Sequence, residues 1–315
     1  SQPNPMKFLV TGGTGFIGSY FVRDIVGRGH EVIAYDAVPN ERALGDAAGK
    51  VEIVRGDVLD LALLLETMKR QGTDYLIHLA YLLILDSDQN PSRAVRVNCD
   101  GTNNVFDAAL LAGVERVVWA SSVSVYGKAS YYGGRAVNED DPPKPFNVYG
   151  ACKVLNEFMG HYYYERKGLD NIGLRFTVAY GPGRLRGGTA FASAMIENPA
   201  LGKPVKVPNG DSLVNWHYVK DIAKAIRLAC EAKSPRYRVY NVGGESRTVR
   251  EAADYIRGLL PDAKIELEPG DWGWQMMFDF SRAEEDLGYR PSYTMEEGIR
   301  EHINAVRRGA GLPEV

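Results

Sequence analysis

Cysteine is scarce in this chain of 315 residues: Cys99, Cys152 and Cys230 are its three cysteines, and no two of them form a Cys-x-x-Cys pair. A disulfide framework is therefore not expected, and this usage is typical of a reducing compartment such as the cytoplasm. The five histidines show no spacing typical of metal ligands. No metal site is predicted.

Long apolar runs and an excess of one charge are also missing. The longest apolar stretch, residues 75–85, is shorter than a membrane-spanning helix and contains a histidine. The N-terminus shows no basic region followed by an apolar core, so no secretion signal is expected. The net charge of -3 gives no electrostatic reason to expect nucleic acid or a membrane as partner. The composition is that of a globular chain with a large core.

Glycine is present where it carries information. A short apolar run, residues 7–11, is followed by Gly-Gly-Thr-Gly-Phe-Ile-Gly and then by an amphipathic stretch. This order predicts a strand, a glycine loop and a helix, the context in which such a loop binds a dinucleotide. Its backbone can approach a pyrophosphate at the helix N-terminus. The predicted contacts are Gly12, Gly15, Phe16, Ile17 and Gly18.

Acidic residues follow the next two predicted strands. Asp36 comes after residues 31–35, where a carboxylate can accept hydrogen bonds from ribose hydroxyls and repel a 2′-phosphate. This favours NAD over NADP, although Arg42 is a candidate phosphate partner. Asp57 follows residues 51–55. It could bind the adenine amino group, cap the predicted helix at residues 61–70, or do both.

Two further predicted strands carry polar residues. Residues 75–79 contain His78, interpreted as a core residue, and end before Ala80, which is small enough to let a cofactor pass. Residues 116–120 lead into Ser-Ser-Val-Ser-Val-Tyr-Gly. Ligands bind at the carboxyl ends of strands in open α/β sheets, so Ser122 or Ser124 could hydrogen-bond a substrate oxygen.

The spacing Tyr-x-x-x-Lys occurs twice on one predicted helix, residues 148–166. It places a phenol and an ammonium on one helical face, where the cation is expected to lower the tyrosine pKa. Tyr149 and Lys153 lie in the first two turns, near the strand ends, whereas Tyr163 and Lys167 lie beside the stop signal Gly168. The first pair is therefore the candidate acid–base pair, and Tyr163 is interpreted as structural.

The regular alternation of strand and helix continues through a sixth strand, residues 171–176, and then breaks. We predict an α/β fold, a doubly wound parallel sheet (Rossmann) with a smaller irregular C-terminal lobe. Residues 1–176 would form the dinucleotide-binding domain. Residues 177–315 would mainly bind substrate, with 216–243 returning to the Rossmann sheet.

Taken together, these motifs resemble the extended short-chain dehydrogenase/reductase family, which contains NAD-dependent sugar epimerases and dehydratases. The resemblance spans nearly the whole chain. It implies that Tyr149 is the general acid/base, that Lys153 binds the nicotinamide ribose and assists Tyr149, and that Ser122 is the active-site hydroxyl. Further positions implied at the cofactor are Asp57, Val58, Leu79, Ala80, Asn98 and Phe176, and those implied at the substrate are Tyr81 and Ser124.

Departures from the family pattern reduce the range of reactions expected of this chain. Dehydratases of this family resemble one another in carrying an Asp-Glu pair directly after the active-site residue. This chain has Val123 and Ser124 there, which cannot act as acid and base, so the elimination of water is disfavoured. Nucleotide-sugar epimerases tend to hold the diphosphate with arginines near two C-terminal positions that lack arginine here. Arg184 and Arg186 could replace them, or be solvated loop charges.

The leading hypothesis is an NAD-dependent epimerase of a sugar or nucleotide sugar. The alternative is a net dehydrogenase or reductase of a smaller sugar, sugar acid or other alcohol, and a non-catalytic NAD-binding sensor is a third. A homodimer is also expected, because the helices predicted at residues 98–112 and 148–166 carry excess apolar residues. These are Phe106, Leu110, Phe158 and Tyr162.

Overall fold

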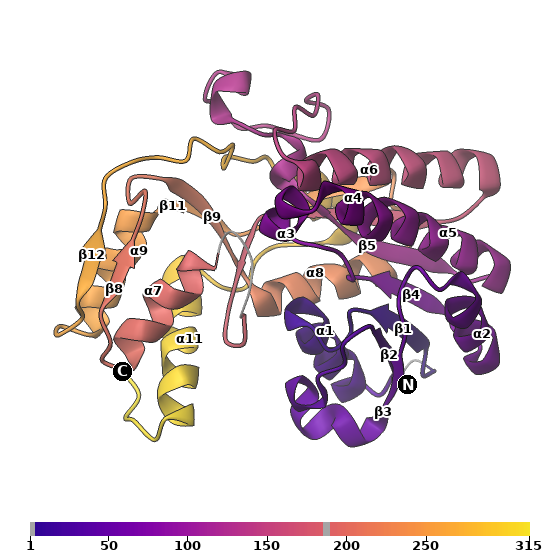
Figure 1. Cartoon of the computed structure of the whole chain (residues 1–315), viewed down its shortest axis with the longest axis horizontal. Helices are drawn as coiled ribbons and strands as arrows, with labels where there is room; N and C mark the ends of the chain where they lie inside the picture. The colour runs from indigo at the N-terminus through magenta and orange to yellow at the C-terminus, as the bar shows by residue number, and fades with distance from the viewer. Residues whose placement is uncertain (1–3, 185–189) are drawn as a thin grey trace.

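A seven-stranded parallel sheet forms the centre of the molecule (Figure 1). The structure is a computed structural model that describes residues 4–184 and 190–315. The strand order is β10-β6-β5-β4-β1-β2-β3. The strands are β1 (Lys7–Thr11), β2 (Glu31–Asp36), β3 (Val51–Arg55), β4 (Tyr75–His78), β5 (Arg116–Ser122), β6 (Asn171–Phe176) and β10 (Val239–Val242). The predicted doubly wound α/β fold is confirmed.

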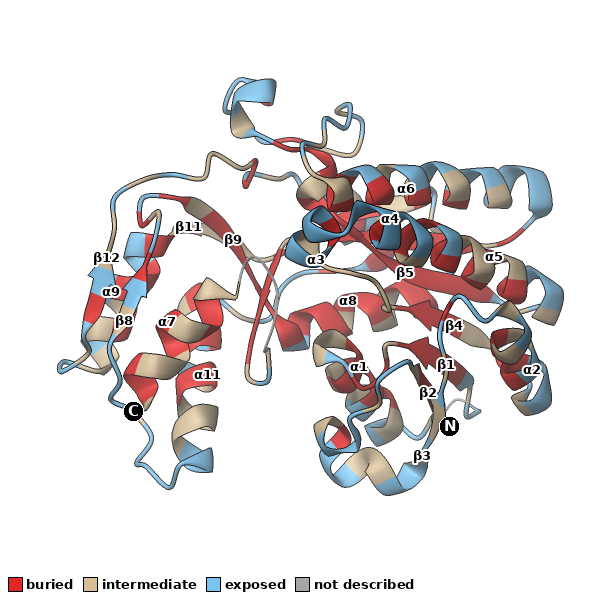
Figure 2. Cartoon of the chain, viewed as in Figure 1, coloured by how far each residue is buried: buried red, intermediate tan, exposed pale blue. Residues whose placement is uncertain are grey.

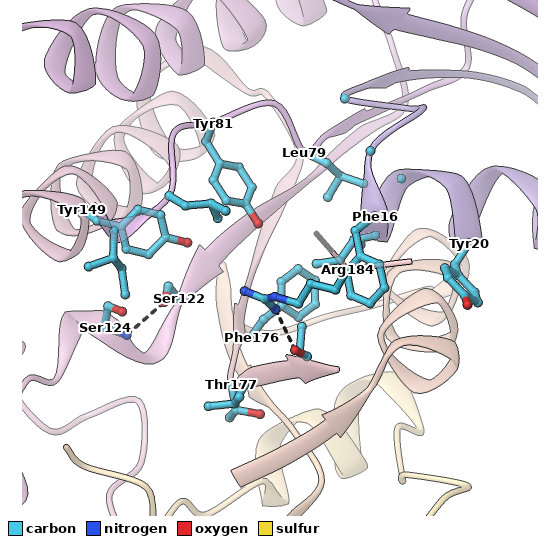
Figure 3. Close-up of a pocket in the computed structure, with 18 of the residues that line it drawn as sticks. Phe16, Tyr20, Leu79, Tyr81, Ser122, Ser124, Tyr149, Phe176, Thr177 and Arg184 are labelled. Carbon is cyan, nitrogen blue, oxygen red and sulfur yellow. Dashed lines mark hydrogen bonds between the residues drawn. The ribbon is translucent and has the colours of Figure 1, made fainter. Parts of the chain in front are cut away.

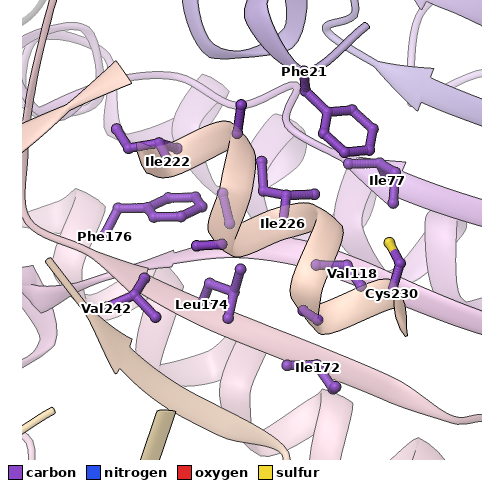
Figure 4. Packing of buried hydrophobic residues seen from close by; sticks show 14 of the residues in the cluster. Phe21, Ile77, Val118, Ile172, Leu174, Phe176, Ile222, Ile226, Cys230 and Val242 are labelled. Atoms are coloured by element: carbon purple, nitrogen blue, oxygen red, sulfur yellow. The ribbon is translucent and has the colours of Figure 1, made fainter. Parts of the chain in front are cut away.

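Helices cover both faces of this sheet, which is why its strands are apolar runs rather than alternating ones. On one face α1 (Phe16–Gly27) packs beside α8 (Val219–Glu231), and Ile222 and Ile226 of α8 lie on Leu174 of the sheet (Figure 4). The other face carries α2 (Leu61–Gln71), α5 (Gly101–Ala112) and α6 (Val148–Lys167).

The strand order reverses between β1 and β4. From β1 the chain proceeds outward through β2 and β3, and from β4 it proceeds the other way through β5 and β6. Because the connections leave in opposite directions, a crevice opens at the carboxyl ends of these two strands, and ligands bind there in such sheets. The glycine loop follows β1 directly, so it lies at this crevice.

A second lobe is built around a smaller sheet of order β11-β9-β7. Its core contains Trp216, Tyr180 and Ile299, and Figure 2 shows β9 as a mostly buried strand. Its elements are β7 (Val178–Tyr180), α7 (Phe191–Ala200), β8 (Val205–Val207), β9 (Leu213–Tyr218), β11 (Glu245–Thr248), α9 (Val249–Leu259), β12 (Ile265–Leu267) and α11 (Met295–Gly309). Strands β8 and β12 pair separately.

The segment 216–243 divides between the lobes. Helix α8 and strand β10 belong to the large sheet and its cover, whereas Trp216–Tyr218 are part of β9 in the second sheet. The expected return to the Rossmann sheet therefore begins at α8 rather than at residue 216. The division of the whole chain at residue 176 stays a prediction.

The helix that carries the candidate acid–base pair has defined ends. The side chain of Asn147 accepts a hydrogen bond from the Gly150 N–H, and Gly168 ends α6 in the left-handed region with φ 73°. The stop signal at Gly168 was predicted. The second helix expected to mediate association, α5, is preceded by α4 (Pro91–Ala94) and a π-helical segment, η2 (Val95–Asp100), so helical structure begins before residue 98.

Short elements complete the chain. They are η1 (Glu41–Lys50), α3 (Ile84–Gln89), η3 (Val123–Val125), η4 (Ala129–Tyr132) and α10 (Ser281–Leu287). Within residues 4–184 and 190–315, no helix combines the length and the apolar character needed to cross a membrane.

Candidate active site

The glycine loop is packed too closely to accept side chains. Gly12 has φ +67°, and a Cβ there would lie 3.0 Å from the Leu79 carbonyl carbon. A Cβ on Gly18 would lie 2.1 Å from the Gly12 oxygen. The loop therefore brings the N-terminus of α1 directly to the crevice, where its N–H groups and dipole favour an anion such as a pyrophosphate.

Asp36 stands at the end of β2 beside this loop. Its carboxylate accepts hydrogen bonds from the Thr14 hydroxyl at 2.8 Å and from the Thr14 N–H at 3.2 Å. The Val38 N–H donates to its other oxygen. These bonds fix the Asp36 carboxylate beside the glycine loop. Thr14 was missed as a site residue, although it lies inside the glycine motif.

Asp57 does not cap the following helix. The N-cap of α2 is Asp60, whose side chain accepts from the Leu63 N–H, because Asp60 directly precedes the first helical residue. Asp57 is exposed and accepts from the Leu59 N–H instead. The capping alternative is therefore wrong, and a role of Asp57 at the adenine stays a prediction.

Two other predicted cofactor residues lie in the protein interior. Val58 is buried beneath Gly101. Asn98 is fully buried, and its amide side chain bonds to both the N–H and the carbonyl of Leu82. Asn98 thereby holds the segment after β4 in place, which positions Tyr81 one residue earlier. Neither Val58 nor Asn98 lines the cleft, and both pack behind the segments that do.

A cleft of about 880 Å³ runs along the crevice, and its size suits a dinucleotide with a small second ligand. At one end it is lined by the glycine loop, and at the other by the strand ends of the second lobe. The sequence-predicted residues on its wall are Gly12, Gly15, Phe16, Ile17, Gly18, Leu79, Tyr81, Ser122, Ser124, Tyr149, Phe176 and Arg184. Arg186 lies outside the described residues.

Two of the three candidate catalytic residues, Ser122 and Tyr149, line the far end of the cleft (Figure 3), and Lys153 is buried beside Tyr149 without lining it. Ser122 ends β5, and its hydroxyl accepts from the Ser124 N–H at 3.0 Å, which orients it. Tyr149 comes from the first turn of α6 and directs its hydroxyl into the cleft. Lys153 lies one turn later, behind the two tyrosines, with its ammonium 3.8 Å from the Tyr81 ring centroid and 5.4 Å from that of Tyr149.

The pKa of Tyr149 differs from the value that the sequence led us to expect. Burial raises the pKa of the Tyr149 hydroxyl well above its ordinary value, and Tyr81 adds to the rise, while the Ser122 hydroxyl and the Arg184 charge lower it. Burial also lowers the pKa of Lys153 to about 7. The expected lowering of the Tyr149 pKa by Lys153 is therefore not found in the free protein, because burial disfavours both charged forms.

A buried polar network holds α6 against the sheet. The Arg175 guanidinium of β6 donates to both carboxylate oxygens of Glu157, at 2.8 and 2.6 Å, and Ser121 of β5 donates to one of them. The Lys153 ammonium donates to the Ala120 carbonyl at 2.7 Å. Glu157 lies one turn after Lys153, so this face of the helix is fixed to β5 and β6 by charged groups.

Two residues were interpreted as structural, and the structure confirms both. His78 is buried, bonds to the hydroxyls of Thr11 and Thr102, and has its pKa lowered to about 3 by burial. Tyr163 donates to Asp107 and packs on the Phe106 ring. Neither lines the cleft.

The substrate end of the cleft includes residues without a sequence motif. Thr177 follows β6, and residues 274–276 reach the cleft from the C-terminal segment, held by the bond from the Gln275 N–H to the Gly127 carbonyl. Trp274 also stacks on its near neighbour Trp272 at 5.1 Å. The contact between Gln275 and Gly127 joins segments that are far apart in the sequence, so no local pattern could have indicated it.

Comparison with known proteins decides the family. The model of the NAD-dependent epimerase/dehydratase family matches residues 8–243. A UDP-glucose 4-epimerase from Mycolicibacterium smegmatis is 32% identical, with 96% of this chain and 99% of that protein covered. The chain belongs to the NAD-dependent epimerase/dehydratase family.

Two solved structures of this type are also similar. The UDP-glucose 4-epimerase of Thermus thermophilus, solved in complex with NAD, has a TM-score of 0.85 and 28% identity, with 96% of this chain and 99% of that chain covered. The L-threonine dehydrogenase of Cupriavidus necator in its holo form has a TM-score of 0.87 and 25% identity, with 95% and 99% covered. Epimerases and dehydrogenases therefore share this fold.

The epimerase/dehydratase family member described here is an NAD-dependent enzyme of the extended short-chain dehydrogenase/reductase type. Its own residues fit the cofactor. The glycine loop leaves no room for a Cβ, the cleft begins at the α1 N-terminus, and the Asp36 carboxylate lies where a 2′-phosphate would be repelled.

Proposed function

We propose that the chain is an epimerase that acts at a secondary alcohol carbon of a sugar or nucleotide sugar. The observation that carries the proposal is that Tyr149 and Ser122 line one end of a cleft that begins at the glycine loop, with Lys153 buried beside the Tyr149 ring. The similarity to UDP-glucose 4-epimerases supports it.

Each catalytic residue has one task. Tyr149 takes the proton of the substrate hydroxyl and later returns it, while Ser122 hydrogen-bonds the same oxygen. Lys153 binds the nicotinamide ribose and places a positive charge behind Tyr149. Bound NAD would accept the hydride from the substrate carbon and return it to the other face, and its nicotinamide charge would favour the Tyr149 phenolate.

The remaining wall of the cleft positions the cofactor. The loop from Gly12 to Gly18 receives the pyrophosphate at the N-terminus of α1, and Asp36 binds the adenosine ribose. Leu79 and Phe176 line the same cleft and would flank the nicotinamide of a bound NAD.

Replacement of Tyr149 tests the proposal. Tyr149→Phe removes the proton-transferring oxygen and leaves the ring, so turnover is expected to fall about 10²–10⁴-fold. NAD affinity, measured by calorimetry, should stay close to that of the wild type. Tyr163→Phe is a matched control on the same helix and should retain activity, because Tyr163 bonds to Asp107 outside the cleft. Undiminished activity of Tyr149→Phe would sink the assignment of Tyr149 as the acid–base residue.

A net dehydrogenase is the second candidate, and one observation favours it. Nucleotide-sugar epimerases tend to carry arginines at two places, beside the stretch that is Val214–His217 here and just before the pair Gly270-Asp271, and this chain has no arginine at either place. The Asn215 side chain is used by Thr177, Gly244 and Ser246. At the second place the Gly270 N–H donates to the Asp211 carboxylate. The missing arginines remove the cations that usually bind the diphosphate.

The two reactions differ in their redox balance. Protein that retains NAD through purification and interconverts two sugars without net NADH supports the epimerase. Formation of one NADH for each alcohol oxidised supports the dehydrogenase instead.

A further inference from the structure

Tyr81 stands on the wall of the cleft between β4 and α3, next to the catalytic residues. Its ring centroid lies 6.0 Å from that of Tyr149, and the two rings are tilted at 47°. Figure 3 shows the two side chains close together at the catalytic end of the cleft. The sequence implied a contact of Tyr81 with the substrate, whereas the structure also brings its ring against Lys153.

The Tyr81 ring faces the Lys153 ammonium. The nitrogen lies 3.8 Å from the ring centroid, well inside the roughly 6 Å within which an aromatic face attracts a cation. The Tyr149 ring is farther from the same nitrogen, at 5.4 Å. Of the two tyrosines beside Lys153, Tyr81 is therefore the one whose ring acts more strongly on the cation.

The ammonium of Lys153 is buried without a carboxylate partner. Lys153 is 2% exposed, and its ammonium donates to the Ala120 carbonyl at 2.7 Å. In the part of the chain that the structure describes it makes no ion pair. Glu157, one turn later on α6, bonds to Arg175 instead, at 2.6 and 2.8 Å. A buried cation needs compensating contacts, so the aromatic face is a substantial part of what stabilises the charge of Lys153.

The protonation of Lys153 is finely balanced. Burial lowers the pKa of Lys153 to about 7, and negative charge on nearby thiols or on a carboxylate acts in the other direction. A lysine with this pKa is half charged at neutral pH, so a change of one unit decides its charge. The titratable groups that face it are Tyr149, Cys152 and Glu157 of α6, Cys99 of η2, His78 of β4, and Tyr81.

The backbone on both sides of Tyr81 is fixed by buried polar groups. The Ala80 N–H donates to the Thr11 hydroxyl at 3.2 Å. The Asn98 side chain bonds to the N–H and the carbonyl of Leu82, at 2.7 and 3.1 Å. Thr11 and Asn98 are both fully buried. Because the residues before and after it are held in this way, the position of Tyr81 is set by the fold.

We propose that Tyr81 is a positioning residue whose aromatic face holds the Lys153 ammonium, in its charged form, beside Tyr149. An ammonium has three N–H donors, so pairing with the Tyr81 face and with the Ala120 carbonyl leaves one donor for the nicotinamide ribose. The proposal rests on the proposed function for the task of Lys153. It adds the group that keeps Lys153 charged for that task.

Substitutions that change the ring face but keep its shape test the proposal. The variants are Tyr81→Phe, Tyr81→Leu and Tyr81→trifluorophenylalanine, in which ring fluorines withdraw electron density from the face that attracts the cation. The pKa of Lys153 is measured by NMR of the NAD-free full chain labelled at the lysine Cε. The Lys153 resonance is assigned by its absence in Lys153→Met.

The expected order of pKa values follows the strength of the ring face. Tyr81→Phe keeps an electron-rich face, so the pKa of Lys153 should stay close to that of the wild type. Tyr81→Leu should lower it by about one unit, a tenfold change in the protonation equilibrium. The trifluorophenylalanine variant should lower it in the same direction, although its shape is that of Tyr81→Phe.

A control separates this effect from the general loss of a tyrosine. Tyr164→Leu, on the same helix as Lys153, removes a ring that lies 4.0 Å from the Arg238 guanidinium and should leave the pKa of Lys153 unchanged. Equal values in Tyr81→Phe and the fluorinated variant would overturn the proposal, as would an unchanged value in Tyr81→Leu.

The contribution of the Tyr81 hydroxyl is measured by the same set. If Tyr81→Phe lowered the pKa of Lys153 as far as Tyr81→Leu, the hydroxyl rather than the ring face would act on the cation, and the proposal would fail. None of these readings depends on turnover. The proposed function is decided separately, by the activity of Tyr149→Phe.

Discussion

At the scale of single residues, burial sets the chemistry of the catalytic group. Lys153 is almost fully enclosed, and burial lowers its pKa to about 7 in the free protein, compared with about 10.4 for an ordinary lysine. Between these values the unfolded chain holds a proton that the folded chain lacks. Unfolding therefore takes up a proton, and stability rises with pH across this window.

Replacement of Lys153 should remove that pH dependence. The contribution of Lys153 to the slope is at most about 1.4 kcal/mol per pH unit. Lys153→Met keeps much of the volume without the titrating group, so the free energy of unfolding should rise less steeply between pH 7 and 10 than in wild type. Urea titrations of NAD-free protein at several pH values measure both slopes. Equal slopes in the two proteins would show that Lys153 keeps its proton when folded.

At the scale of elements, α6 is held in place by its contacts with the sheet. Its first turn begins at the Asn147 cap, and its buried face reaches Arg175 and Ser121 through Glu157. The side chains of Arg175 and Glu157 are 5% and 11% exposed, so loss of either would leave a buried charge without its partner. The network thereby fixes the helix that carries Tyr149 and Lys153.

Replacement of Arg175 should lower the stability of the protein and loosen the attachment of α6 to the sheet. For Arg175→Met we expect a loss of about 3–5 kcal/mol in unfolding free energy, measured by urea denaturation. Arg308→Met removes an exposed ion pair with Glu314 and should cost less than about 1 kcal/mol. A loss for Arg175→Met as small as that of the control would mean that Glu157 is not held by this pair.

At the scale of the whole molecule, the outer surface of α5 and α6 carries several exposed apolar side chains. Leu110, Phe158 and Tyr162 are 37%, 66% and 45% exposed. The expectation for Phe106 was wrong, because this residue is fully buried and packs on Trp119 of its own sheet. Leu111 and Leu155, which were not predicted, extend the exposed set.

We propose that a second copy of the chain covers this surface. Phe158→Asp places a charge at its most exposed aromatic side chain and should convert a dimer to a monomer in analytical ultracentrifugation, while NAD affinity is retained. Tyr131→Asp, at an exposed aromatic residue on the distant segment η4, should leave the association unchanged. A monomeric wild-type protein would contradict the proposal directly.

The sequence by itself determined the parts of this protein that depend on local chemistry. Gly12 and Gly18 mark a loop because no larger residue fits, and the Asn147 and Gly168 signals bound α6 because they satisfy its own terminal groups. The alternation of strands and helices predicted the parallel sheet, because strands that are buried on both faces must be continuous apolar runs.

Only the tertiary structure decided what depends on distant segments. Arg184 and Trp274 line the same cleft as Tyr149 through turns and pairings that carry no periodic signal. The pKa of Tyr149 rises rather than falls because enclosure by several elements outweighs its one-turn neighbour Lys153. Side-chain spacing is a property of one helix, whereas desolvation and charge at a site are sums over every element packed around it.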